Sequence, residues 1–267
     1  MVDKFIGREN INPYFMAAGL FIKRLKWDLN YKSWDSRKKI KKLNNKYLGK
    51  KAVITCNGPS LNKVDFSLLK NTNIYTFGLN KINLLFDKTD FRPSCIVSVN
   101  PFVIDQNSSY FNSTDITLFI SSNRSGIVNR RKNVIYINSC YSLGRFARNC
   151  NFSLNEGSTV TFVALQLAFH MGFSEVGIIG CDHYFSQSGY SNKTVTSESI
   201  DKDHFDSKYF ADGAKWQLPD LPSSELHYSI ADEQYKYFGR KIYNCTVGTK
   251  LNIFEKMNLN DFIALKK

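Results

Sequence analysis

The feature that most constrains this chain is an alternation of short apolar runs with helical stretches after residue 50. The apolar runs, which have the length and composition of buried strands, span residues 51–56, 74–79, 94–99, 116–121, 133–138, 175–180 and 241–246. The clearest helix begins at Ser158 or Thr159 and ends at Gly172, with one apolar stripe along it. This order predicts an α/β fold in which helices cover both faces of a mainly parallel, Rossmann-like sheet.

Small polar residues follow four of the predicted strands. They are Asn57 with Gly58 and Ser60, Asn80, Asn100, and Asp182 with His183. A single Asn after a strand is a common turn residue, because its side chain bonds its own backbone. Four such positions at one edge of a parallel sheet favour a shared ligand, since ligands of such sheets lie beyond the carboxyl ends of the strands.

Two helix starts could present backbone N–H groups to a phosphate. The first is the Asn57-Gly58-Pro59-Ser60 loop, and the second is Gly157-Ser158-Thr159. Neither has the glycine spacing of a Walker A loop or of a dinucleotide-binding fingerprint. The second start is equally compatible with an ordinary N-cap.

The four histidines differ in their surroundings. His170 lies within the predicted helix beside its apolar stripe, which favours a structural role, whereas His183, His204 and His227 lie in or beside polar segments. A titratable imidazole in the polar loop above the edge of the sheet could take a proton from a hydroxyl. The spacing of the histidines matches no zinc site, and no metal ligand is predicted. Asp201 and Asp203 are alternatively a Mg²⁺ pair or solvated loop charges.

Positive charge is concentrated at the start of the chain. Residues 1–51 hold fourteen Lys and Arg against four Asp and Glu, which is +10 of the net +13. Because a nucleic-acid enzyme spreads such charge over its folded groove, no nucleic-acid partner is expected. Residues 1–49 are predicted to form a basic amphipathic helical leader that either contacts an anionic membrane surface or packs on the body or a partner subunit.

The remaining residues, 50–267, are predicted to form one Rossmann-like catalytic domain, with 186–224 as a polar lid or acceptor loop. No apolar run reaches 18 residues, and the six Cys form no C-x-x-C pair. Reduced thiols and the charge order near the start indicate a cytoplasmic protein, peripherally associated with the inner face of the plasma membrane.

Taken together, these motifs resemble those of the bacterial sialyltransferases of glycosyltransferase family 42. The similarity is greater to the related Maf/MptE-like group, domain of unknown function family 115, and covers about residues 50–255. The matching segments are Asn57-Gly58-Pro59-Ser60-Leu61, Asn80, Asn100-Pro101, residues 156–161 through 180–183, residues 241–246 and residues 251–254.

The resemblance implies a GT-A-like sialyltransferase variant of the fold, in which the three Asn positions and the Gly-Ser-Thr segment bind a CMP-sugar. It further implies a His base, with His204 as the first candidate and His227 as the second. It also implies tyrosines that steady the leaving phosphate, with candidates Tyr184, Tyr190 and Tyr209. The activity expected is inverting transfer of a nonulosonic acid or Kdo-like sugar from CMP to a glycan or lipid-linked glycan in surface polysaccharide synthesis, with no cofactor required.

Two alternatives remain open at this point. One is the MptE-like 6-hydroxymethylpterin pyrophosphokinase activity, which would use ATP and Mg²⁺ with Asp201 and Asp203 as metal ligands. The other is a non-catalytic nucleotide-binding protein of a polysaccharide assembly complex. Self-association of the chain is also left open.

Overall fold

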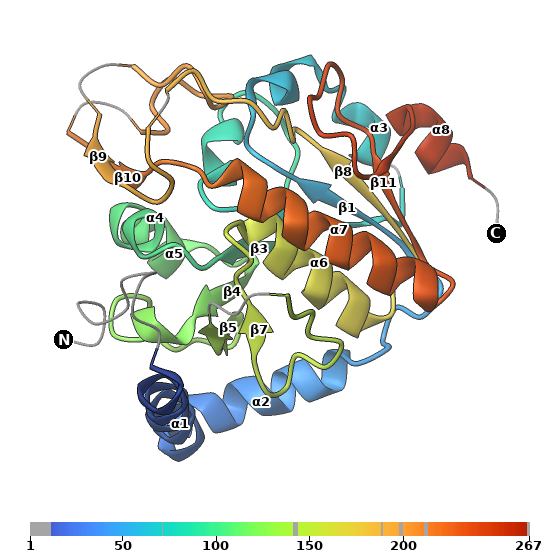
Figure 1. Cartoon of the computed structure of the whole chain (residues 1–267). Coiled ribbons are helices and arrows are strands. Elements are labelled where there is room, and N and C mark those ends of the chain that lie inside the picture. The colour runs from blue at the N-terminus through green and yellow to red at the C-terminus, as the bar shows by residue number, and fades with distance from the viewer. Residues whose placement is uncertain are drawn as a thin grey trace.

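A computed structural model describes residues 12–70, 72–140, 144–187, 189–197, 200–210 and 213–265. Its centre is an eight-stranded sheet with the order β12-β11-β8-β1-β2-β3-β4-β5, in which every neighbouring pair is parallel (Figure 1). The strands are β1 (Lys51–Thr55), β2 (Tyr75–Leu79), β3 (Cys95–Ser98), β4 (Thr117–Ser121), β5 (Val134–Ile137), β8 (Glu175–Ile179), β11 (Lys241–Asn244) and β12 (Glu255–Lys256). The predicted parallel α/β fold is therefore confirmed.

The order of the strands places a topological switch point beside β1. From β1 the chain adds β2 to β5 on one side, and it then returns to add β8, β11 and β12 on the other side. Strands β1 and β8 run side by side, with Lys51 opposite Glu175 and Thr55 opposite Ile179. The connections that leave these two strands diverge, which opens a crevice at their carboxyl ends.

Helices cover both faces of the sheet, because the strands present apolar side chains on both faces and these must be buried. One face packs on α2 (Tyr31–Leu43), α6 (Val160–Met171) and α7 (Leu221–Tyr237). The other packs on α3 (Ser67–Lys70), α4 (Pro101–Gln106), α5 (Ser108–Ser113), α8 (Leu259–Ala264) and the 3₁₀ turns η1 (Pro59–Lys63) and η2 (Ile82–Leu85). The remaining elements are η3 (Ser122–Arg124) and two short strand pairs, β6 (Ser139–Cys140) with β7 (Leu154–Asn155) and β9 (Thr194–Thr196) with β10 (Lys215–Gln217).

The predicted leader consists of two helices that behave differently. In α2 the Ser36 hydroxyl accepts a hydrogen bond from the Tyr136 N–H of the edge strand β5 at 3.0 Å, and Ile40 is buried against the sheet. Helix α2 thus protects an edge that would otherwise be free to pair with another strand. By contrast, α1 (Pro13–Leu29) is largely exposed, and only Trp27 is buried.

Helix α7 begins at Leu221, earlier than the sequence pattern indicated, so the predicted loop 186–224 ends inside it. Asp220 caps the helix by accepting from the Ser223 N–H at 3.1 Å, and Pro222 lies in the first turn. The polar residues of this first turn concealed the helical period. Among the described residues, no helix has the length and apolar character needed to cross a membrane.

Candidate functional site

A cavity of about 500 Å³ lies at the switch point, where the carboxyl ends of β1, β2, β3 and β8 meet the start of α6. Its far wall comes from residues 203, 204, 209, 210 and 216–221. The cavity brings together most of the predicted ligand-binding positions: Asn57, Gly58, Asn80, Asn100, Ser158, Thr159, Asp182, His183 and the candidate base His204. Ser60, Gly157 and His227 lie outside the described lining.

The loop after β1 is held by β8. The Asp182 carboxylate accepts hydrogen bonds from the Ser60 N–H at 3.1 Å and from the Ser60 hydroxyl at 2.7 Å, while the Gly58 N–H donates to the Gly180 carbonyl at 2.8 Å. A Cβ on Gly58 would lie 2.0 Å from the Asp182 carboxylate, so only glycine allows this approach. In this conformation Asp182 and Gly180 accept the N–H groups of Ser60 and Gly58, so these two groups are not free for a phosphate, and phosphate binding by this loop stays a prediction.

The three asparagines line the cavity but have different contacts. Asn100 caps α4 through the Phe102 N–H at 2.9 Å, which is a structural role. Asn80 has a left-handed backbone, with φ of 51°, and its side-chain oxygen accepts from the Ser98 hydroxyl. Asn57 donates to the Leu79 carbonyl, and its side-chain oxygen is buried with no partner among the described residues. Asn57 therefore retains an acceptor for a ligand.

The start of α6 forms the second predicted anion site. Gly157 and Ser158 both have left-handed backbones, with φ of 56° and 60°, and Thr159 is the N-cap, accepting from the Thr161 N–H. The Thr159 hydroxyl lies 3.3 Å from the Tyr228 hydroxyl of α7. Since the first turn of this 12-residue helix lines the cavity, its partial positive charge faces the space where a phosphate would lie.

His204 is paired with Asp201 at the far wall. The Asp201 carboxylate bonds Nδ1 of His204 at 2.8 Å, and the imidazole stacks on Tyr209 with ring centroids 4.0 Å apart. Burial opposes ionisation of Asp201, but its bond to His204 and the backbone N–H groups of Asp203 and Phe210 lower its pKa below the usual value. An ionised Asp201 holds the proton on Nδ1 and leaves Nε2 as the acceptor.

This pairing also bears on the alternative role of Asp201 as a metal ligand. Its carboxylate is bound by His204 and backbone groups, whereas Asp203 accepts from the Ser186 N–H at 2.7 Å and the Ser186 hydroxyl at 3.0 Å. Within the described part of the chain, no three His, Cys, Asp or Glu side chains are grouped as metal ligands. The donor set around Asp201 and Asp203 does not fit a Mg²⁺ pair in this conformation.

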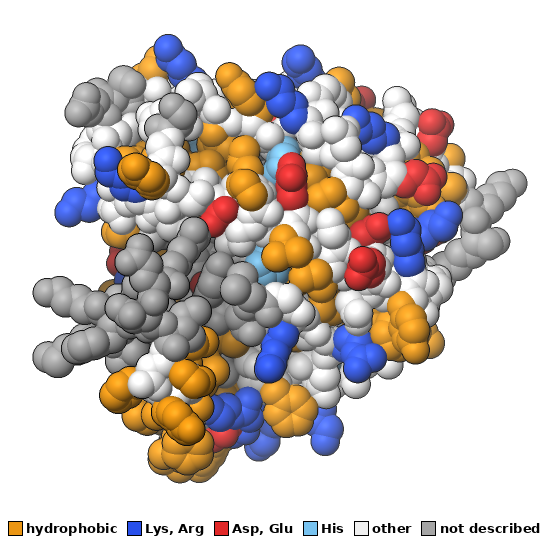
Figure 2. Space-filling model, viewed as in Figure 1, with side chains coloured by type: hydrophobic (Ala, Val, Ile, Leu, Met, Phe, Trp, Pro, Cys, Tyr) orange, Lys and Arg blue, Asp and Glu red, His pale blue; other side chains and the backbone are white. Residues whose placement is uncertain are grey.

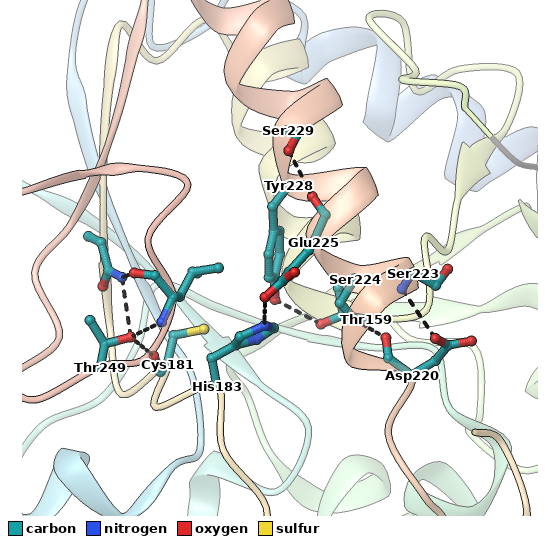
Figure 3. A network of polar contacts seen from close by, with 12 residues as sticks. Thr159, Cys181, His183, Asp220, Ser223, Ser224, Glu225, Tyr228, Ser229 and Thr249 are labelled. Carbon is teal, nitrogen blue, oxygen red and sulfur yellow. Dashed lines mark hydrogen bonds and ion pairs between the residues drawn. The ribbon is translucent and has the colours of Figure 1, made fainter. Parts of the chain in front are cut away.

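A second imidazole, that of His183, also lines the cavity and is paired with a carboxylate. Its Nε2 lies 2.9 Å from Glu225 of α7, and its ring lies beside Tyr228 with centroids 6.1 Å apart (Figure 3). The backbone of His183 is left-handed, with φ of 56°, which is uncommon for a residue with a Cβ. Such strain at the end of a central strand is typical of functional sites.

The other two histidines are buried in the scaffold. His227, the second choice as base, is fully buried on α7: its Nδ1 donates to the Ser223 carbonyl at 2.6 Å and its ring packs on Phe162. That position keeps it away from an acceptor hydroxyl. His170 bonds the Ile40 carbonyl of α2 through Nε2 at 2.9 Å, and burial lowers its pKa. This agrees with the structural role expected for it.

Sequence reasoning missed the residues that hold His204 in place. Lys81 is buried next to Asn80 and donates to the Tyr209 carbonyl at 2.6 Å and to Gln106 at 2.8 Å. Burial lowers the pKa of Lys81 to about 8, and the charge of Asp201 opposes that shift. A lone Lys after a strand gives no sign of burial, so only the three-dimensional contacts reveal this role. The Asp-x-x-His spacing of 201–204 was a local signal that could have been recognised.

The three tyrosines considered as phosphate ligands differ in burial and in their position relative to the cavity. Tyr209 is buried beneath His204, and its pKa is raised by burial. Tyr184 is half exposed and lines the cavity, whereas Tyr190 is 86% exposed. Tyr228, which was not considered, is buried and lines the cavity beside the α6 start.

The charged side chains of the lining limit which ligands the cavity can bind. Four carboxylates lie in the described lining, on Glu156, Asp182, Asp203 and Asp220, and no Lys or Arg does. The groups available to an anion are therefore imidazoles, amides, hydroxyls and the α6 N-terminus. Such a site suits a ligand with one phosphate charge better than a triphosphate.

Comparisons with solved structures agree with this fold. The Maf glycosyltransferase from Magnetospirillum magneticum AMB-1 superimposes with a TM-score of 0.50 at 14% identity, over 95% of this chain and 44% of that one. The chain thus spans less than half the length of that enzyme. The Campylobacter jejuni sialyltransferase CstII, in complex with a substrate analogue, cytidine-5'-monophosphate, matches at a TM-score of 0.35 and 13% identity, over 80% of this chain and 86% of that one. Both neighbours are glycosyltransferases.

Among curated protein sequences, none matches this chain. A family model does match, over residues 27–188. The match begins within α1 and includes α2, so the family resemblance starts earlier than residue 50, where the sequence motifs had placed it. Because it covers more than half of the residues, the chain belongs to the family described as 6-hydroxymethylpterin diphosphokinase MptE-like.

Proposed function

We propose that this protein transfers a nonulosonic acid or Kdo-like sugar from a CMP-activated donor to a glycan hydroxyl, with His204 as general base. The observation that carries the proposal is the Asp201–His204 pair in the wall of the switch-point cavity. An imidazole oriented by a buried carboxylate is an arrangement suited to removing a proton from a hydroxyl. The fold shared with the Maf enzyme is compatible with this chemistry.

In this mechanism, Nε2 of His204 takes the proton of the acceptor hydroxyl as its oxygen attacks the anomeric carbon. The bond between that carbon and the phosphate oxygen breaks, CMP leaves with the electron pair, and the configuration inverts. Asp201 stays ionised and offsets the charge of the imidazolium. The α6 N-terminus, with Ser158 and Thr159, offsets the charge that develops on the departing phosphate.

A CMP-activated acidic sugar fits the cavity better than ATP does, because its one phosphodiester charge and one carboxylate charge are fewer than the charges of a triphosphate. The orphan side-chain oxygen of Asn57 can accept a hydrogen bond from an amino group, such as that of cytosine. A donor carboxylate would be met by amide and hydroxyl groups, since no Lys or Arg lies in the described lining.

Family membership favours a second candidate, the pyrophosphokinase after which the family is described. That reaction uses ATP with Mg²⁺. The carboxylates of Asp201 and Asp203 are bound by other groups, so this activity would require another metal-ligand set or a rearranged loop. The single phosphate charge favoured by the cavity argues for the transferase.

Calorimetric titration with CMP, CDP, UDP, GDP and ATP, each with and without Mg²⁺, separates the two candidates. Selective binding of CMP without metal supports the transferase, and transfer is then assayed with CMP-activated sugars. Mg²⁺-dependent selection of ATP would instead support the pyrophosphokinase. Binding of a nucleotide without turnover of either substrate class would indicate a non-catalytic assembly protein.

We also propose that α1 places the enzyme on an anionic membrane surface, where lipid-linked acceptors lie. Apolar side chains gather on this helix (Figure 2, lower left), and the exposed ones are Tyr14, Phe15, Met16, Leu20, Phe21, Ile22, Leu25 and Leu29. Lys23, Arg24 and Lys26 lie among these apolar residues; Lys23 and Arg24 donate to the Ser139 and Phe152 carbonyls of the body, and Lys26 is exposed. A second copy is a poorer cover for this surface, because it would bring together two like-charged regions: residues 1–51 carry a net charge of +10, of which α1 itself carries +2.

Sedimentation with vesicles tests the membrane proposal. The full chain is expected to bind phosphatidylglycerol vesicles and to bind phosphatidylcholine vesicles weakly, with added salt reducing the difference. The double variant Phe15→Glu/Phe21→Glu should lose binding, whereas Leu48→Glu, an equally exposed apolar position outside α1, should retain it. Equal binding by both variants, or a stable dimer that only the first variant dissociates, would contradict the proposal.

A further inference from the structure

A single tryptophan in the far wall of the cavity has an unused hydrogen-bond donor. Trp216 lies on β10, lines the cavity and is 6% exposed, yet its indole Nε1 has no partner among the described residues. A buried donor without a partner destabilises a protein, and most such groups are satisfied in native structures. The indole N–H is therefore available to an oxygen of a bound molecule.

Trp216 is held in place next to the candidate base. Phe210 packs edge-on against His204 with centroids 5.2 Å apart, and Trp216 stacks on Phe210 with centroids 5.3 Å apart at an angle of 14°. The backbone of β10 is fixed by pairing with β9 and by Gln106, which donates to the Lys215 carbonyl at 2.7 Å. Phe210 thus lies between the indole of Trp216 and the imidazole of His204, which would receive the acceptor proton.

The surroundings of Trp216 select against an acidic ligand. Asp203 and Asp220 line this half of the cavity, and no Lys or Arg of the described lining would offset the charge of a further carboxylate. Phe210, Trp216 and Leu218 together form an apolar wall. An apolar wall with one well-placed donor suits a molecule with an apolar face and hydroxyl groups, such as an uncharged pyranose.

We propose that Trp216 marks the acceptor subsite, where its indole N–H donates to an oxygen of an uncharged sugar and holds a neighbouring hydroxyl near Nε2 of His204. This assignment rests on the proposed transferase function and adds the class of acceptor to it. The acceptor oxygen binds on the His204 side of the cavity, opposite the α6 N-terminus that serves the phosphate.

Tryptophan fluorescence tests the subsite directly, because the chain has only Trp27, Trp34 and Trp216. The protein is saturated with CMP and titrated with methyl β-D-glucopyranoside or methyl β-D-glucuronide, two probes of the same ring that differ in charge. The neutral glycoside should change the emission of the wild type and of Trp34→Phe, an exposed control position. The change should be absent in Trp216→Phe, and the glucuronide should give none.

Transfer assays with a neutral glycan acceptor give the second readout. Trp216→Phe keeps an aromatic ring against Phe210 but removes the donor, so the KM for the acceptor should rise about tenfold, the cost of one hydrogen bond to a buried donor. An unchanged KM, tighter binding of the glucuronide, or an emission change that persists in Trp216→Phe would overturn the subsite. Failure of the wild type to bind CMP would instead overturn the transferase proposal.

Discussion

The two imidazoles that line the cavity are each paired with a carboxylate, and the two carboxylates differ in how far they are buried and in how they are held. Asp201 lies three residues before His204, its side chain is 6% exposed, and backbone N–H groups hold its oxygens. Glu225 comes from a different element, 42 residues after His183, and its side chain is 53% exposed. The first pair is fixed by its own turn, whereas water screens the second pair and its geometry depends on how α7 docks.

The largest effect is expected at the fixed pair. His204→Gln should lower the rate of transfer by about a thousandfold, because it removes the proton acceptor. CMP affinity, measured by calorimetry on the same samples, should change little, since His204 lies across the cavity from α6. If His227→Gln caused the same loss with its fold intact, the assignment of the base would be wrong.

Asp201→Asn tests the partner of that base. The amide can no longer hold the proton on Nδ1 or offset the charge of the imidazolium, so kcat should fall about a hundredfold. The melting temperature should also fall, because both oxygens of Asp201 accept backbone N–H groups and the amide nitrogen leaves one of these donors unpaired. Because the pKa of Asp201 lies below its usual value, this carboxylate should stay ionised between pH 5 and 7 and should not itself cause a loss of wild-type activity in that range. If Asp201→Asn retained its activity, the buried Asp201–His204 pair would be no more important to catalysis than the exposed Glu225–His183 pair.

His170 provides a third comparison, an imidazole without any carboxylate. Burial lowers its pKa in the folded protein, so its neutral form stabilises the fold above the unfolded pKa of about 6.5. This stabilisation should decline as the pH falls below that value. Urea unfolding across the range should show the decline, and His170→Gln should reduce it. If the free energy of unfolding of His170→Gln depended on pH as it does in the wild type, groups other than His170 would be responsible for the decline.

The smallest effect is expected at the screened pair. Glu225→Gln should alter kcat/KM by less than about threefold, because exposed ion pairs contribute little and the amide still reaches His183. Glu233→Gln, an exposed position on the same helix, is the matched control. A loss approaching that of Asp201→Asn would show that the exposed pair is as important to catalysis as the buried one.

The sheet could be predicted from the sequence because burial on both faces leaves a local pattern. Strand β1 has three consecutive apolar residues, Ala52, Val53 and Ile54, and the polar residue Asn57 follows its end. The placement of Asn57, Asn80 and Asn100 in one cavity followed from parallel topology alone. These are local signals, and they allowed the edge of the sheet that carries the cavity to be located.

The rest of the site depends on contacts between distant segments, which leave no pattern in a single sequence. The Asp182 contact with Ser60 spans 122 residues, and it occupies an N–H group that the sequence suggested could face a phosphate. Lys81 looks like a surface residue until Tyr209, 128 residues later, covers it. The role proposed for Trp216 likewise depends on its stacking against Phe210 and its place in the cavity lining, which the sequence does not reveal.

The hydrogen bond between Ser36 of α2 and Tyr136 of β5 has a consequence for the order in which the newly made chain acquires structure. The two residues are 100 positions apart, and α2 leaves the ribosome first. At about 5–20 residues per second, α2 waits roughly 5–20 s for its strand, with its apolar side uncovered. During biosynthesis, chaperones therefore have time to bind this segment before the β5 edge closes over it.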